Sequence, residues 1–113
     1  MAEKLKYINI NKELIPYEFD IVLDKKLYVL GLNYNYTYDF FSVDLYRNKE
    51  LILSGEKLIY GLPLFVNYQY LDVPKNIVLI PLDITEDNND ITYDNFNESV
   101  FIYIFNKDEL EEQ

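Results

Sequence analysis

Apolar and polar side chains alternate at every second residue in several short stretches of this chain, which is typical of a β-sheet with one buried face. Tyr17–Leu23 shows it most clearly, with aromatic and aliphatic side chains on one face and Glu18 and Asp20 on the other. Composition favours strands as well, because 12 Tyr and 7 Phe stand among many Ile, Val and Leu. No stretch of ten or more residues has a convincing period of 3.6. The sequence therefore predicts an all-β fold.

The alternating stretches and the polar breaks between them predict the order of the strands. We expect strands at Lys4–Ile10, Tyr17–Leu23, Leu27–Asn35, Asp39–Tyr46, Glu50–Leu53, Lys57–Tyr60, Asn76–Leu82 and Ser99–Phe105. Ser54-Gly55-Glu56 is predicted to be a turn. Gly61–Lys75 contains Pro63 and Pro74 without strict alternation, which indicates a long irregular crossover.

Two of these strands are expected to take particular places in a sheet. Pro81 favours an edge or a strand end for Asn76–Leu82. Ser99–Phe105 is apolar on both faces, which predicts a central strand that is covered on both sides. The expected architecture is a single small antiparallel β-barrel or β-sandwich over residues 1–113, with a flexible acidic tail at 107–113.

The residue types that are missing exclude several kinds of chemistry. The chain has no Cys and no His, and therefore offers no thiolate nucleophile, Zn-thiolate site, imidazole base or Ser-His-Asp triad. A net charge of −10 disfavours nucleic-acid binding. The longest uncharged stretch, Leu58–Leu71, is shorter than the roughly 20 apolar residues of a spanning helix. The first residues contain no apolar signal region, so we expect synthesis in the cytoplasm.

Carboxylates are the only candidates for a metal site or for catalysis. The acidic stretch Asp83–Asp90, with Asp94 beyond it, does not match an EF-hand loop, and a solvated acidic turn is favoured over bound calcium. Two of Asp44, Glu56 and Asp83 could in principle form the carboxylate pair of a glycosidase, but their spacing selects no pair. We therefore expect no catalytic residues, no metal and no cofactor.

Tyrosine clusters and uneven charge point instead to contacts with other molecules. Tyr34, Tyr36 and Tyr38, with Tyr68 and Tyr70 further on, offer apolar rings with polar tips. Such a platform suits a protein partner or a sugar. Residues 1–57 carry a net charge of −1 and residues 58–113 a net charge of −9, which indicates either a solvated surface or a face for a basic partner.

Five stretches, taken in order, carry a resemblance to a known family. They are Ile15–Ile21, Asp39–Tyr46, Gly55–Phe65, Ile80–Asp83 and Ile91–Phe96, the last leading into the final strand. The ordered set resembles the small baseplate plug proteins of contractile-tailed bacteriophages and of related phage-tail-like particles. No single stretch is a chemical signature, so the resemblance rests on their order along nearly the whole chain.

The resemblance implies a structural role without enzyme activity, in a virion or tail-like particle. It implies a β-rich component at the baseplate axis that contacts hub, spike and tail-tube proteins, in several copies of a symmetric assembly, and that aids assembly or closes the tube lumen. For such a component we expect the crossover to anchor a neighbouring subunit, through Tyr60, Leu64, Phe65, Tyr68 and Tyr70. The alternative is a small carbohydrate-binding β-module that uses the Tyr clusters.

Overall fold

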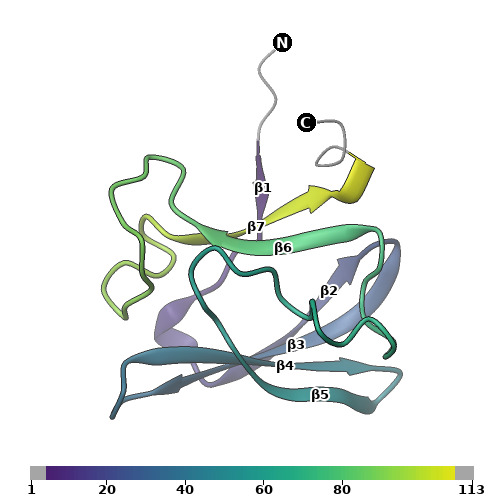
Figure 1. The fold of residues 1–113 in the computed structure, drawn as a ribbon. Helices are drawn as coiled ribbons and strands as arrows, with labels where there is room; N and C mark the ends of the chain where they lie inside the picture. The colour runs from purple at the N-terminus through teal and green to yellow at the C-terminus, as the bar shows by residue number, and fades with distance from the viewer. Residues whose placement is uncertain (1–4, 109–113) are drawn as a thin grey trace.

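The computed structural model describes residues 5–108 and consists of two antiparallel sheets packed face to face (Figure 1). Its elements are β1 (Lys6–Tyr7), the short 3-10 helix η1 (Lys12–Leu14), β2 (Tyr17–Leu23), β3 (Lys26–Asn35), β4 (Phe40–Arg47), β5 (Glu50–Lys57), β6 (Ile77–Leu82) and β7 (Phe101–Asn106). One sheet has the order β2-β3-β4-β5 and the other β1-β7-β6. The all-β prediction is confirmed. Of its two alternatives the sandwich is correct, because the described strands close no barrel.

The four-stranded sheet is built from two hairpins whose turns have the same geometry. Asp24 and Lys25 both have positive φ, 54° and 65°, and so do Asn48 and Lys49, 53° and 67°. Positive φ at both central residues is the pattern of a type I′ turn, whose twist matches that of the flanking strands. Both hairpins therefore form without the Asn-Gly or Asp-Gly pair that usually marks such a turn.

Strand β5 differs from its prediction, because Ser54-Gly55-Glu56 is not a turn. The strand runs through this segment, and its pairing with β4 shifts register there. Gly55 has a φ of +74°, which glycine adopts without strain in a bulge as readily as in a turn. The Ser54 hydroxyl and the Gly55 N–H both donate to Asp44 Oδ1, at 3.1 and 2.8 Å. The separate strand predicted at Lys57–Tyr60 is therefore wrong.

The first strand is shorter than the alternation at its start suggested. Only Lys6 and Tyr7 pair with β7 as a strand, and the Ile8 N–H then donates to the Ile102 carbonyl at 2.9 Å. Ile8 and Ile10 nevertheless point into the core, with 2% and 3% of their surface exposed. Lys4, which the prediction included, and most of the predicted acidic tail lie outside the described residues.

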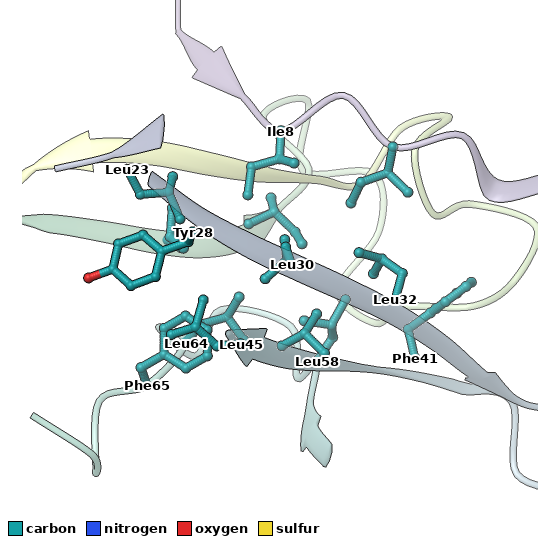
Figure 2. Close-up of a cluster of buried hydrophobic side chains, with 14 of the residues drawn as sticks. Ile8, Leu23, Tyr28, Leu30, Leu32, Phe41, Leu45, Leu58, Leu64 and Phe65 are labelled. Carbon is teal, nitrogen blue, oxygen red and sulfur yellow. The ribbon is translucent and has the colours of Figure 1, made fainter. Parts of the chain in front are cut away.

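The hydrophobic core lies between the two sheets and is completed by the crossover. Alternate residues of β3 and β4, such as Leu30, Leu32 and Phe41, are fully buried. Residues 61–75 form no strand, as predicted, but they insert Leu64 and Phe65 into the same cluster (Figure 2). The crossover is therefore part of the core as well as a connection between the sheets.

The three-stranded sheet confirms the predicted places of its strands. β7 lies in the centre, and β6 lies at an edge with Pro81 near its end. The crossover covers that edge, because the N–H groups of Gly61 and Leu64 donate to the Pro81 and Leu79 carbonyls at 2.9 and 2.8 Å. Within residues 5–108, no helix is long and apolar enough to cross a membrane.

Replacing Phe65 with alanine should destabilise the fold strongly. The ring is buried in the core cluster, so the Phe65→Ala variant should lose about 3–5 kcal/mol of unfolding free energy in urea titrations. The matched control is Tyr70→Ala, since Tyr70 lies on the same crossover but is 80% exposed. It should change stability by no more than about 0.5 kcal/mol. Equal losses for the two variants would contradict this core.

Replacing Tyr28 with phenylalanine should leave stability unchanged or raise it by up to about 1 kcal/mol. The Tyr28 hydroxyl is buried and has no hydrogen-bond partner among the described residues, so its removal breaks no bond. The control is Tyr34→Phe, which removes a hydroxyl that donates to Asp39 at 2.7 Å and should lower the urea midpoint. A lower midpoint for Tyr28→Phe would show that its hydroxyl does have a partner.

Candidate interaction surfaces

The five residues predicted to contact a partner fall into two groups in the structure. Leu64 and Phe65 are 6% and 2% exposed and pack inside the domain, beside Tyr28 and Leu45 of the core cluster (Figure 2). Tyr60 and Tyr68 are half-buried, and Tyr70 is exposed. Of these five residues, only the three tyrosines have side-chain surface that a partner could contact.

The crossover that carries these tyrosines is held by hydrogen bonds to its backbone. The Phe65 N–H donates to Glu56 Oε2 at 2.9 Å, and Gln69 Nε2 donates to the Phe65 carbonyl at 3.0 Å. The Lys75 ammonium group donates to the Gln69 and Leu71 carbonyls. These bonds fix the segment that presents Tyr68 and Tyr70, whose ring centroids lie 6.4 Å apart.

A second surface, which the sequence did not single out, covers the side of the three-stranded sheet that faces away from the core. We call it the outer aromatic face; its residues are Tyr7, Val78, Ile80, Leu82, Phe101, Tyr103 and Phe105. The register places them on one side, with Tyr103 opposite Tyr7 and Ile80. None of them belongs to the core cluster. All seven are apolar or aromatic, and the described residues form no third sheet over them, although Tyr103 is almost completely buried.

The aromatic rings of this face pack against one another along and across the strands. Tyr7 lies 4.5 Å from Phe101 and 6.1 Å from Tyr103, between ring centroids, and Tyr103 lies 6.3 Å from Phe105. Tyr103 is only 4% exposed while Tyr7 is 46% exposed. Burial, followed by the charge of Asp83, raises the pKa of the Tyr103 hydroxyl above its ordinary value. The face is therefore a set of mutually packed rings.

The sequence did contain the signal for this surface. Ser99–Phe105 was predicted to be apolar on both faces and covered on both sides, and the register confirms apolar residues on both faces of β7. The core covers only the side of Ile102 and Ile104. Apolar residues on both faces of a strand therefore indicate either a strand that is covered on both sides or, as in β7, a strand with one apolar face outside the core.

Tyrosines from distant parts of the chain form a third cluster, beside η1. Tyr34 lies 5.1 Å from Tyr36 and 5.0 Å from Tyr93, between ring centroids. With Lys12 and Glu13 these rings line a cavity of about 350 Å³. The Lys12 ammonium lies 4.8 Å from the Tyr93 ring centroid, a cation–π contact. The hydrogen bond to Asp39 raises the pKa of Tyr34 to about 12.

The sequence predicted this cluster in part. Tyr34 and Tyr36 do lie together, whereas Tyr38 does not line the cavity and is 77% exposed in the turn after β3. Tyr93 was missed because it is far away in the sequence and stands in no alternating stretch.

The acidic stretch after β6 is organised around Asp83, which is 3% exposed. Its carboxylate accepts hydrogen bonds from the Thr85 N–H and hydroxyl, at 2.9 and 2.6 Å, and from the Asn88 N–H and side-chain amide, at 3.0 and 2.9 Å. The side-chain bonds from Thr85 and Asn88 are the main reason that the pKa of Asp83 falls to about 2. Within residues 5–108, no three or more acidic side chains gather as metal ligands.

Each carboxylate that was considered as a catalytic group has a local structural task. Asp44 holds the β5 bulge, Glu56 holds the backbone of Phe65, and Asp83 organises the turn after β6. They lie on three different elements, and each accepts hydrogen bonds from nearby backbone N–H groups. The geometry therefore explains why these acidic residues are present without invoking a reaction.

Acid should weaken the fold through Asp83. Its folded pKa of about 2 lies below the ordinary 3.8, so the stabilisation is complete above the ordinary value and is lost as pH falls toward 2. Asp83→Asn should therefore lower the urea midpoint most at neutral pH, and its difference from the wild type should shrink between pH 4 and about pH 2.

Thr85→Val serves as a graded control, because it removes one of the donors to Asp83 and should show a smaller version of the same pH dependence. A difference between wild type and Asp83→Asn that stays constant from pH 7 to about pH 2 would contradict the assignment.

Comparison with known proteins identifies a family for the chain as a whole. The chain matches the family model described as cyanophage baseplate Pam3 plug gp18 over residues 5–108. A search of curated proteins found no match. The family match confirms the resemblance that the ordered stretches of the sequence carried.

Proposed function

Because this chain belongs to the cyanophage baseplate plug family, we propose that it is a plug at the central axis of a contractile-tail baseplate, where it contacts the hub and the tail tube. The family match over residues 5–108 carries this proposal, since it spans every described strand. The family is a structural one, so the expected role is structural rather than enzymatic. The chain would aid assembly of the baseplate or close the tube lumen.

The exposed tyrosines of the crossover support contacts with neighbouring subunits. Protein interfaces are enriched in Tyr and Phe, because such rings bury a large area at a low entropic cost. Tyr70 is exposed and Tyr68 is half-buried on a segment whose backbone is held by hydrogen bonds, so little backbone freedom remains to be lost on binding. Tyr60, whose hydroxyl accepts a bond from the Asp83 N–H at 2.9 Å, would contribute at the end of β6.

The charge of the chain supports a basic partner. The second half holds most of the excess acid, including Glu86, Asp87 and Asp90, which are exposed after β6. Charge complementarity between surfaces speeds encounter and fixes orientation. A hub or tube surface rich in Lys and Arg would therefore suit this side of the plug.

The cavity lined by Tyr34, Tyr36 and Tyr93 supports a second candidate function, the binding of a carbohydrate. Its volume of about 350 Å³ falls in the range of small-ligand sites, and its tyrosine lining suits a sugar ring. A glycan-binding module would retain sugars as an isolated protein, whereas a plug should bind tail proteins. Glycan-array binding that Tyr36→Ala abolishes would favour this alternative.

The plug proposal predicts that the chain sediments with contractile tails. Proteomics of sedimented particles from a producing bacterium should detect the chain together with sheath and tube proteins. Intact tails that sediment without the chain would contradict the proposal.

If Tyr68 and Tyr70 contact a neighbouring subunit, replacing them should reduce incorporation of the chain into particles. The double variant Tyr68→Ala/Tyr70→Ala should reduce the amount of the chain in particles at least severalfold, while Tyr38→Ala, an exposed tyrosine elsewhere, should not. The measurement is an immunoblot of particles made with each variant. Equal amounts of both variants in particles would remove the crossover from the contact surface.

A further inference from the structure

We infer that the outer aromatic face is the docking surface for a different baseplate protein, whose matching surface is apolar at its centre and basic where it meets residues 83–87. This inference rests on the proposed function and assigns the contact to one sheet face. One of the three strands that form it, β6, leads directly into the acidic turn that begins at Asp83.

The composition of the face indicates a protein partner. Seven neighbouring positions on three strands carry no charge, in a chain of which 27% of the residues are charged. A solvated side of an antiparallel sheet normally alternates to polar residues, as β2 does with Glu18 and Asp20. Tyr7 is exposed, Tyr103 is buried and the other five side chains are half-buried. Partly exposed apolar side chains that are contiguous over three strands indicate an interaction site.

The rings are arranged as a rigid anchor. Tyr7 stands 46% exposed and rests on Phe101, while Tyr103 beside it is almost completely covered. Packed aromatic side chains have already lost their rotamer freedom, so docking on them costs little further entropy. A central buried aromatic cluster is also what dominates the energy of most protein interfaces.

The acidic residues next to the face indicate which charge the partner carries at the edge of the contact. The segment after β6 first rises on the outer side of the three-stranded sheet and then turns back (Figure 1), because Asn89 and Asp90 line a cavity with Phe40 and Lys57 of the other sheet. Glu86 and Asp87 are exposed on the first part of this segment, and Asp83 is held at its base beside the Leu82–Phe101 pair. A surface that covers the rings therefore meets these carboxylates at one end, and Lys or Arg there would complement them.

The same charges argue against a second copy of this chain as the occupant. Each copy has a net charge of −10, so two copies repel each other at a distance.

Photo-crosslinking in assembled particles tests the occupant. The photoreactive amino acid p-benzoylphenylalanine is placed at position 7 in the producing bacterium, where it preserves an aromatic ring, and at position 51 as a control. Leu51 is an exposed strand residue of the other sheet, with 54% of its surface accessible. Irradiated particles should give a crosslink from position 7 to a different baseplate protein, at a peptide with Lys or Arg nearby. Position 51 should not give this crosslink.

Charge insertion supplies a second readout. Tyr7→Lys should lower the amount of the chain in sedimented particles at least tenfold relative to Leu51→Lys, with both purified variants showing the same urea midpoint. Neutralising the acidic segment with Glu86→Gln and Asp87→Asn together should lower that amount severalfold.

The outcomes separate this inference from the proposed function. If wild-type chain is absent from particles, the plug role itself fails. If wild-type chain is present but position 7 crosslinks to a second copy or to nothing, or Tyr7→Lys enters particles as well as Leu51→Lys, the docking face is wrong. Normal incorporation of the Glu86→Gln/Asp87→Asn variant would overturn the basic rim.

Discussion

The insertion of Leu64 and Phe65 between the two sheets holds this molecule together. A two-sheet sandwich of this length has few strands with which to close its core, and the crossover supplies the side chains that the strands do not. Because the same segment also donates backbone hydrogen bonds to β6, it fixes how the three-stranded sheet lies on the four-stranded one. Glu56 completes this arrangement by accepting the Phe65 N–H.

This use of the crossover determines which surfaces remain for partners. Leu64 and Phe65 are buried in the core, so the crossover presents Leu62, Val66 and Tyr70 as exposed side chains and Tyr68 as a half-buried one. The three-stranded sheet, in contrast, has one face on the core and an apolar face over which the described residues form no third sheet. A structural component of a baseplate needs surfaces that bind other proteins rather than catalytic residues. Among the acidic residues next to this face, Asp83 accepts hydrogen bonds from its own turn, and the exposed ones contribute negative charge.

The sequence predicted the parts of the fold that depend on local alternation. The bounds of Tyr17–Leu23 were predicted to the residue, because aromatic and aliphatic side chains that pack against the core alternate there with exposed Glu18 and Asp20. The bulge at Gly55 was mistaken for a turn, since a glycine with positive φ suits both and the bonds to Asp44 come from the neighbouring strand. The end of β1 was also missed, because alternation continues through Ile8 and Ile10 after strand pairing has stopped.

The candidate surfaces were harder to predict from the sequence, because they depend on contacts between residues that are far apart in the chain. Burial of Leu64 and Phe65 depends on where an irregular segment passes over the sheets, which no periodicity reports. The packing of Tyr93 on Tyr34 joins residues that are far apart in the chain. The apolar pattern on both sides of β7 was recognised, but a covered face and an interaction face have the same pattern.

Cryo-electron microscopy of the baseplate of a contractile tail that contains this chain tests the account most directly. The account predicts density for the chain on the tail axis, with Tyr7, Phe101 and Phe105 packed against a neighbouring baseplate protein and basic side chains of that protein facing residues 83–87. A chain bound at the periphery of the baseplate, or a chain on the axis whose outer aromatic face is open to solvent, would contradict it.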